Sequence, residues 1–168
     1  MRLNVTLRAP SACSLDELAA FREFVEQGDE VDSNGLQCRI KRATTLAFGT
    51  CDGSLVAVAA IKRQELDYRK RIFKKATIGD SAANYLHELG WIFVAPDFRD
   101  NKFSVELVRN ALAPLSAENV YSTTKTNNTP MHHTLLKFGF AAAGKPWRSS
   151  RGPYNLVMYL RPAPNRIR

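Results

Sequence analysis

The sequence predicts a single α/β (α+β) domain in which strands and helices follow one another along the chain. Its 168 residues are enough for one well-buried core and do not clearly require two. Hydrophobic residues make up 45% and charged residues 24%, which is typical of a soluble globular protein and not of a disordered one. We see no repeat, low-complexity segment or linker. Residues 1–168 are therefore interpreted as one domain.

The first elements expected are a strand and a capped helix. Leu3, Val5 and Leu7 alternate with polar residues, which is a strand pattern. Ser14 and Glu17 form a capping-box sequence at the start of the helix. The apolar residues on one side of this helix are Leu15, Leu18, Phe21, Phe24 and Val25. Gln27-Gly28 should end the helix, because glycine is common at helix C-termini.

A polar loop over Gly28–Gly35 and a short basic piece of unclear structure over 37–42 precede the strongest local signal in the chain. Thr44–Cys51 and Ser54–Lys62 are two apolar, β-prone runs joined by Asp52-Gly53. Asp-Gly between such runs is typical of a two-residue β-hairpin turn. We therefore predict a hairpin here.

The segment over about 62–85 is the least regular part of the sequence and its basic pole. Its cations are Lys62, Arg63, Arg69, Lys70, Arg71, Lys74 and Lys75. Tyr68 and Phe73 are interleaved with them. One interpretation is a solvated connecting insert with about one helical turn. The other is a lobe over 62–75 that docks an acidic or nucleic-acid substrate, with aromatic rings available for stacking.

A strand, a turn and a helix follow. Glu88–Val94 is largely apolar, as a central strand should be, and Ala95-Pro96-Asp97 should end it, because proline cannot donate to a β ladder. A helix is expected from about Ser104 to Pro114, with Val105, Val108 and Leu112 buried. A turn at a helix N-terminus favours an anion, and Arg99 and Lys102 lie in this turn. Phosphate or pyrophosphate is the natural ligand.

The last elements are a strand, a helix and a closing hairpin. Asn119–Lys125 is β-branched and aromatic, as strands are. Thr129 and Pro130 suit the N-cap and first position of a helix. Met131, Leu135 and Phe138 repeat at helical spacing. The final strands are expected over Ala141–Trp147 and Tyr154–Leu160, followed by a short basic tail over 162–168.

Two of these segments carry a resemblance to a known family. Val94, Pro96 and Arg99 match the first part of motif A of the GCN5-related N-acetyltransferases (GNAT), in which a strand is followed by Q/R-x-x-G-x-G/A. The two small residues of that motif are Lys102 and Ser104 here. The segment 128–140 resembles motif B, with matches at Asn128, Lys137, Gly139 and Phe140. The two motifs lie within residues 94–140, and the order of elements over the rest of the chain is consistent with the family.

The resemblance implies a GNAT-like fold whose mixed central sheet has two parallel strands that splay apart, here Glu88–Val94 and Asn119–Lys125. Acetyl-CoA would lie between them as co-substrate, with its pantetheine on exposed backbone of the first strand and its pyrophosphate on the turn. The expected cofactor-binding residues are Ile92, Phe93, Val94, Arg99, Asp100, Asn101, Lys102, Phe103, Ser104 and Asn128. Lysine is larger than glycine, but its charge could compensate by reaching a phosphate.

The implied reaction is direct acetyl transfer to an amine, which needs an acceptor of the amine proton and a proton for the leaving thiolate. Glu88 is the candidate base, because it begins the central strand and shares a face with Gly90, Ile92 and Val94 by alternation. The alternative is a surface carboxylate paired with a cation. The family often has a tyrosine four residues before the motif B glycine, and that position is Leu135 here. The substitutes considered as catalytic acid are Tyr121, Ser122, Thr123 and Tyr154.

Several alternatives stay open. The net charge of +8 and a pI near 9.7 favour anionic partners. The acceptor is expected to be a small-molecule or peptide amine, with a nucleic acid (a tRNA-linked amine or a DNA base) as the second choice. A non-catalytic CoA-binding module is a third, and a homodimer is not excluded. No metal is expected, because the adjacent His132 and His133 diverge on a helix. We see no signal peptide or membrane span, so a cytoplasmic protein is expected.

Overall fold

The computed structural model describes residues 1–28 and 31–165, so parts of the predicted loop Gly28–Gly35 and of the basic tail 162–168 lie outside the described residues. The fold is mixed α/β, with a seven-stranded mixed sheet in the order β1-β2-β3-β4-β5-β7-β6. The chain forms two compact units. The first contains Met1–Lys62 and Leu89–Ala113, and the second contains Arg63–Glu88 and Pro114–Arg168. That residues 1–168 act as one domain stays a prediction.

The strands of the first unit are β1 (Asn4–Arg8), β2 (Thr45–Cys51), β3 (Ser54–Lys62) and most of β4 (His87–Val94). β2 pairs antiparallel with both β1 and β3. The predicted hairpin is confirmed. Asp52 and Gly53 both have positive φ, 50° and 81°, as a two-residue type I′ turn requires.

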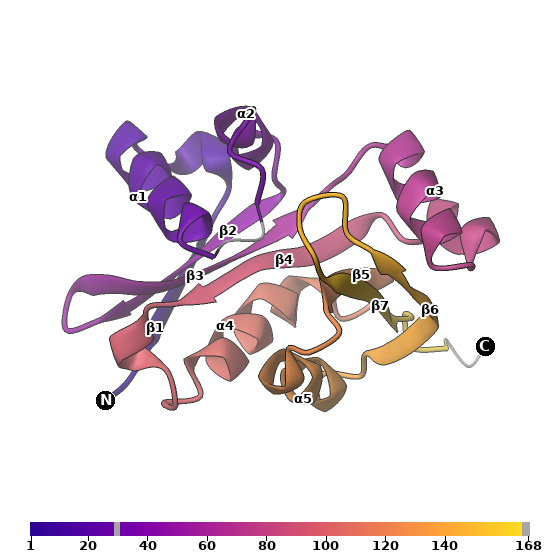
Figure 1. The fold of residues 1–168 in the computed structure, drawn as a ribbon. Helices are drawn as coiled ribbons and strands as arrows, with labels where there is room; N and C mark the ends of the chain where they lie inside the picture. Colours follow the sequence, from indigo (N-terminus) through magenta and orange to yellow (C-terminus); the bar gives the residue numbers. More distant parts are fainter. Residues whose placement is uncertain (29–30, 166–168) are drawn as a thin grey trace. The chain divides into compact units, whose positions relative to one another are not determined.

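Helices cover both faces of these strands (Figure 1). α1 (Leu15–Glu26) and α2 (Leu36–Lys41) pack on one face, where Phe21 meets Phe48 edge-on. α4 (Phe103–Leu112) packs on the other through Phe103 and Leu107. The alternating side chains of β2 and β3 therefore supply two cores. The capping box is confirmed, but Leu15 is 79% exposed and lies off the buried stripe.

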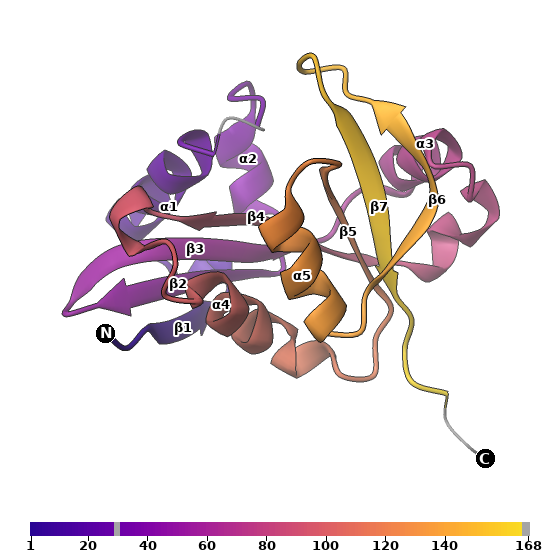
Figure 2. The same cartoon turned by 60° about the horizontal axis from the view of Figure 1, so that its bottom comes forward.

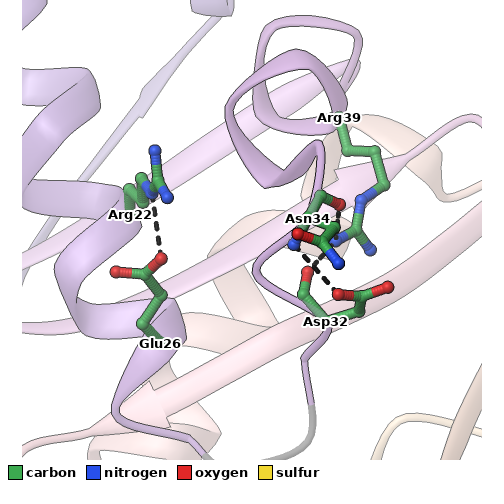
Figure 3. A network of polar contacts seen from close by, with 5 residues as sticks. All are labelled: Arg22, Glu26, Asp32, Asn34 and Arg39. Carbon is green, nitrogen blue, oxygen red and sulfur yellow. Dashed lines mark hydrogen bonds and ion pairs between the residues drawn. The ribbon is translucent and has the colours of Figure 1, made fainter.

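The segment without a sequence assignment, 37–42, is largely the short helix α2. Figure 3 shows how the chain before it is held. The Asp32 carboxylate accepts a hydrogen bond from the Asn34 amide at 2.9 Å, and Arg39 donates to the carbonyl oxygens of Asp32 and Asn34. Leu36 and Ile40 are fully buried. Two apolar residues at helical spacing are therefore enough to fix this helix against its unit.

The second unit contains β5 (Val120–Lys125), β6 (Ala141–Arg148) and β7 (Asn155–Arg161), with β7 antiparallel to both neighbours. These strands confirm the predicted final elements. α5 (Thr129–Lys137) follows β5 in the chain, and Figure 2 shows it running alongside β5 and β7. The first two residues of β4 pair in parallel with β5, as His87 with Val120 and Glu88 with Tyr121.

The interpretation of 62–85 as a solvated insert is wrong. Residues Leu66–Lys75 form the ten-residue helix α3, and Gly79–Asn84 form a 3₁₀ segment, η2. Ile72, Phe73 and Ala76 are buried against Tyr121 and Met158 of the sheet. The sequence pattern does not reveal this helix, because only Ile72, Phe73 and the buried Arg69 of the helix face the core, while four of its exposed residues are cations.

Two helix starts differ from the predictions. Asn128, not Thr129, caps α5, because its side chain accepts the Met131 amide at 3.2 Å. Pro130 is thereby the second helical residue. α4 begins at Phe103, and Val105 is only half-buried, because Phe103, Leu107 and Ala111 form the inner face together with Val108 and Leu112. In the part of the chain that the structure describes, no helix is both long and apolar enough to span a bilayer.

Candidate active site

The turn between β4 and α4, in the first unit, has a defined backbone. β4 ends as the Ala95 amide donates to the Val56 carbonyl at 2.9 Å, and Pro96–Phe98 form one 3₁₀ turn, η3. The Asn101 side-chain amide donates to the carbonyls of Phe98 and Arg99, both at 3.2 Å. Carbonyl oxygens of the turn are thus satisfied by the turn itself, which favours an anion and not a cation as its ligand.

Aromatic packing fixes where α4 begins. The rings of Phe98 and Phe103 stack with centroids 6.4 Å apart, and Phe103 is buried. Among the residues that the structure describes, no side chain caps the helix. The amides of Val105 and Glu106 donate to the Lys102 carbonyl, which leaves the earlier amides of the helix to bind a ligand.

Arg99 is exposed and is held by the end of β4. Its Nε donates to the Val94 carbonyl at 3.2 Å, and its guanidinium lies 5.8 Å from the centroid of the Phe93 ring. Among the described residues, no carboxylate pairs with Arg99. The anchored guanidinium is therefore available for a phosphate group.

Lys102 occupies a left-handed conformation, with φ 58° and ψ 22°, and Asp100 has φ 69°. Position 102 is where motif A has glycine, and the backbone keeps the conformation that glycine adopts most easily. The turn therefore has a backbone conformation that suits glycine, although its residue is lysine. Sequence alone could not show whether the lysine would alter the turn.

We expect Lys102→Gly to raise the free energy of unfolding by about 1 kcal/mol, because a non-glycine residue in the left-handed region is strained. Lys102→Ala keeps the strain and should leave stability close to that of the starting protein. Both variants remove the charge, so equal loss of CoA affinity in both would assign that loss to the ammonium group. Urea unfolding and calorimetry measure the two effects. A Lys102→Gly protein no more stable than Lys102→Ala would contradict the strain.

The Glu88 carboxylate lies in the second unit and is 3% exposed, so its interpretation as a surface carboxylate is wrong. Its Oε2 accepts a hydrogen bond from Gln64 Nε2 at 3.0 Å and another from the Tyr121 hydroxyl at 3.3 Å. The predicted alternation is confirmed from Trp91 to Val94, since Ile92 and Val94 pack against one core and Trp91 and Phe93 against the other. Trp91 has φ 50°, which interrupts the extended backbone between Glu88 and Ile92.

Arg69 organises the segments around Glu88. It is 6% exposed, and its guanidinium donates to the carbonyls of Gln64, Ala82 and Tyr85 at 2.7–3.2 Å. These three carbonyls come from the start of α3, from η2 and from the chain entering β4. Sequence analysis missed both Gln64 and Arg69 as site residues, because a glutamine and one arginine in a basic run carry no distinguishing signal.

Tyr121 is fully buried and packs edge-on against Phe73 at 5.2 Å. Burial and the adjacent Glu88 carboxylate raise the pKa of Tyr121 well above its ordinary value. Its hydroxyl donates to Glu88, so its role in the structure is to hold that carboxylate. The structure thus brings two predicted site residues together.

The other candidates for the catalytic acid lie elsewhere in the second unit. Ser122 is buried, and Leu135 is fully buried in the position of the family tyrosine. Tyr154 is half-buried at the end of the β6–β7 turn, where the Lys125 ammonium lies 4.4 Å from its ring centroid. Asn128 uses its side chain to cap α5.

His132 and His133 lie in different surroundings. His132 bonds to the Lys125 carbonyl at 2.9 Å and contacts the Tyr159 ring, while His133 is exposed. Within residues 1–28 and 31–165, no group of three or more His, Cys, Asp or Glu side chains could hold a metal ion. Burial lowers the pKa of His87, whose buried Nδ1 has no hydrogen-bond partner among the described residues.

Comparison with known proteins gives one family and one fold. The model of the acetyltransferase (GNAT) family matches residues 14–140. An acyl-CoA N-acyltransferase from Pseudomonas aeruginosa has a TM-score of 0.70 and 13% identity, over 95% of this chain and 99% of its own. ElaA of Escherichia coli has a TM-score of 0.68 and 15% identity, over 95% of this chain and 99% of its own. YncA of Salmonella typhimurium, whose structure contains its cofactor acetyl-CoA, has a TM-score of 0.65 and 12% identity, over 94% of this chain and 92% of its own. No curated protein sequence matches the chain.

Proposed function

Because the chain belongs to the acetyltransferase (GNAT) family, we propose that it transfers an acetyl group from acetyl-CoA directly to an amine. The observation that carries this proposal is the turn of residues 99–104. It combines an anchored, exposed Arg99, a left-handed Lys102 and an uncapped helix start. These groups suit the pyrophosphate of CoA.

In this proposal, some residues bind the cofactor and others accept or position the proton. Backbone amides at the start of α4, with Arg99 and Lys102, hold the pyrophosphate, and exposed backbone of Ile92–Val94 pairs with the pantetheine. Glu88 accepts the proton of the attacking amine, directly or through one water. Gln64 and Tyr121 hold the carboxylate in position for this step.

The leaving group of this reaction is the CoA thiolate, which must be protonated. The nitrogen–carbonyl bond forms as the carbon–sulfur bond breaks, and the thiolate takes a proton. Tyr121 is a poor donor, because its raised pKa keeps its proton on the phenol. A CoA thiolate is a stable leaving group, so water can protonate it. We infer an amine acceptor of the small-molecule or peptide class as the first choice.

Calorimetric titration with acetyl-CoA, and with CoA for comparison, tests the cofactor. Arg99→Glu should weaken binding about 10- to 100-fold, because a charge-assisted hydrogen bond to phosphate is replaced by repulsion. Arg42→Glu is the matched control, since Arg42 is an exposed arginine of the same unit at the end of α2.

Two results would count against this assignment. If Arg99→Glu and Arg42→Glu bind acetyl-CoA equally well, the turn does not hold the pyrophosphate. If acetyl-CoA binds but free thiol is never released with any amine or peptide, the chain is a non-catalytic CoA-binding module of the same fold.

A further inference from the structure

The basic character of this protein is concentrated in one of its two units. The second unit contains fourteen Lys and Arg residues and five Asp and Glu residues, so it accounts for more than the whole formal charge of +8. The first unit is close to neutral. A field confined to one unit points to an anionic partner of that unit.

The exposed side of α3 is the centre of this charge. Ile72, Phe73 and Ala76 turn inward, which leaves Lys70, Arg71, Lys74 and Lys75 exposed over its last two turns. Lys70 with Lys74, and Arg71 with Lys75, are like-charge pairs at i, i+4, which disfavour a helix. The dipole of the helix stabilises Lys74 and Lys75 in its last turn, and Asp67 is the one acidic residue of α3 at favourable spacing from Lys70 and Arg71.

β6 extends this surface. The Lys145 amide donates to the Ala76 carbonyl at 2.9 Å, so Lys145 lies beside the C-terminus of α3. The Lys145 side chain is exposed. We call Lys70, Arg71, Lys74, Lys75 and Lys145 the α3–β6 basic surface. Within the described part of the chain, no ion pair neutralises any of the five.

The structure removes two cations from the basic lobe that the sequence suggested over 62–75. Lys62 and Arg69 do not belong to the surface, although both lie in the basic segment 62–75. The Lys62 ammonium lies 4.8 Å from the Trp91 ring centroid in the first unit, and Arg69 is buried on three carbonyls. The remaining cations are exposed and come from α3 and from β6.

We propose that the α3–β6 basic surface binds the sugar–phosphate backbone of a single-stranded nucleic acid. Cations repeated along a helix match a polyanion with repeated charges. Tyr68 adds a half-buried aromatic ring at the edge of the surface, with the Arg71 guanidinium 5.7 Å from its centroid. An aromatic ring beside phosphate-binding cations suits a nucleotide better than an acidic peptide, because bases stack on such rings. This binding does not depend on the proposed acetyl transfer.

Fluorescence anisotropy with labelled 20-nucleotide single-stranded RNA and DNA tests the proposal on the full chain, without acetyl-CoA. We expect micromolar affinity at low salt and a slope of roughly −3 for log affinity against log salt, from about five phosphate contacts. The double variant Lys70→Glu/Lys74→Glu should weaken binding at least tenfold. Lys70→Gln/Lys74→Gln should weaken it less and should lower the slope by about one to two.

Lys41→Glu/Arg42→Glu is the matched control, because it makes the same charge change at exposed positions of the first unit. It should weaken binding less than about threefold, since the surface is intact. Equal effects of the two charge-reversed variants would overturn the proposal in favour of net charge alone. Binding of polyglutamate as tight as that of RNA would overturn it in favour of an acidic protein. Absence of binding at low salt would also overturn it.

Discussion

Glu88→Gln is expected to lower the turnover of acetyl-CoA about 100- to 1,000-fold, because a positioned general base contributes that order of rate. The affinity for acetyl-CoA should stay within a few fold, since the pyrophosphate turn is made of other residues. Release of free thiol with a panel of amines and peptides measures turnover, and calorimetry measures affinity.

The amide is a fair replacement because of the contacts around Glu88. Gln64 and the Tyr121 hydroxyl both donate to its carboxylate, and the carbonyl oxygen of a glutamine can still accept from them. Glu88→Ala would leave the buried Tyr121 hydroxyl and the half-buried Gln64 amide without this acceptor and would confuse catalysis with folding. The glutamine variant therefore removes the basic oxygen while the surrounding hydrogen bonds can persist.

Glu118→Gln is the matched control, because Glu118 is an exposed carboxylate of the same unit. It should turn over acetyl-CoA at the normal rate. If Glu88→Gln were as active as Glu118→Gln at every pH tested, Glu88 would be a buried structural carboxylate. His87, with a lowered pKa and an unpartnered Nδ1, would then be the next residue to examine as the base.

Sequence was a good guide where a few adjacent residues determine the backbone. Asp52-Gly53 strongly favours a type I′ turn through its own backbone preferences, and both residues have the positive φ of that turn. Ser14 and Glu17 satisfy each other's amides within a single helical turn. The strand–turn–helix over β4 and α4 follows in the same way from an apolar run, a proline and a second apolar periodicity.

Sequence was a poor guide where the stabilising partner lies far along the chain. α3 is held by three apolar residues and by Arg69. The acceptors of Arg69 are backbone carbonyls, which every residue has, so the sequence does not mark them. The partners of Glu88 lie 24 and 33 residues away. The positive φ of Trp91 interrupts the extended backbone of β4, and a count of alternating residues cannot detect such a bend.

Gly144→Ala is expected to lower the free energy of unfolding by roughly 3 kcal/mol or more, through a backbone clash in the second unit. Gly144 has φ 68°, and a Cβ there would lie 1.8 Å from the Ala76 carbonyl oxygen. That oxygen also accepts the Lys145 amide. A side chain at 144 would therefore separate the C-terminus of α3 from β6.

Gly139→Ala separates the two causes of instability. Gly139 also has positive φ, 82°, but a Cβ there would meet only the Arg161 side chain, at 3.7 Å. Its cost should be about 1 kcal/mol, from backbone strain alone. Urea unfolding of both variants gives the difference between them. Since the strain is common to both, that difference measures how firmly the backbone contact fixes α3 on β6. Equal losses would show that α3 can move away from β6 at little cost.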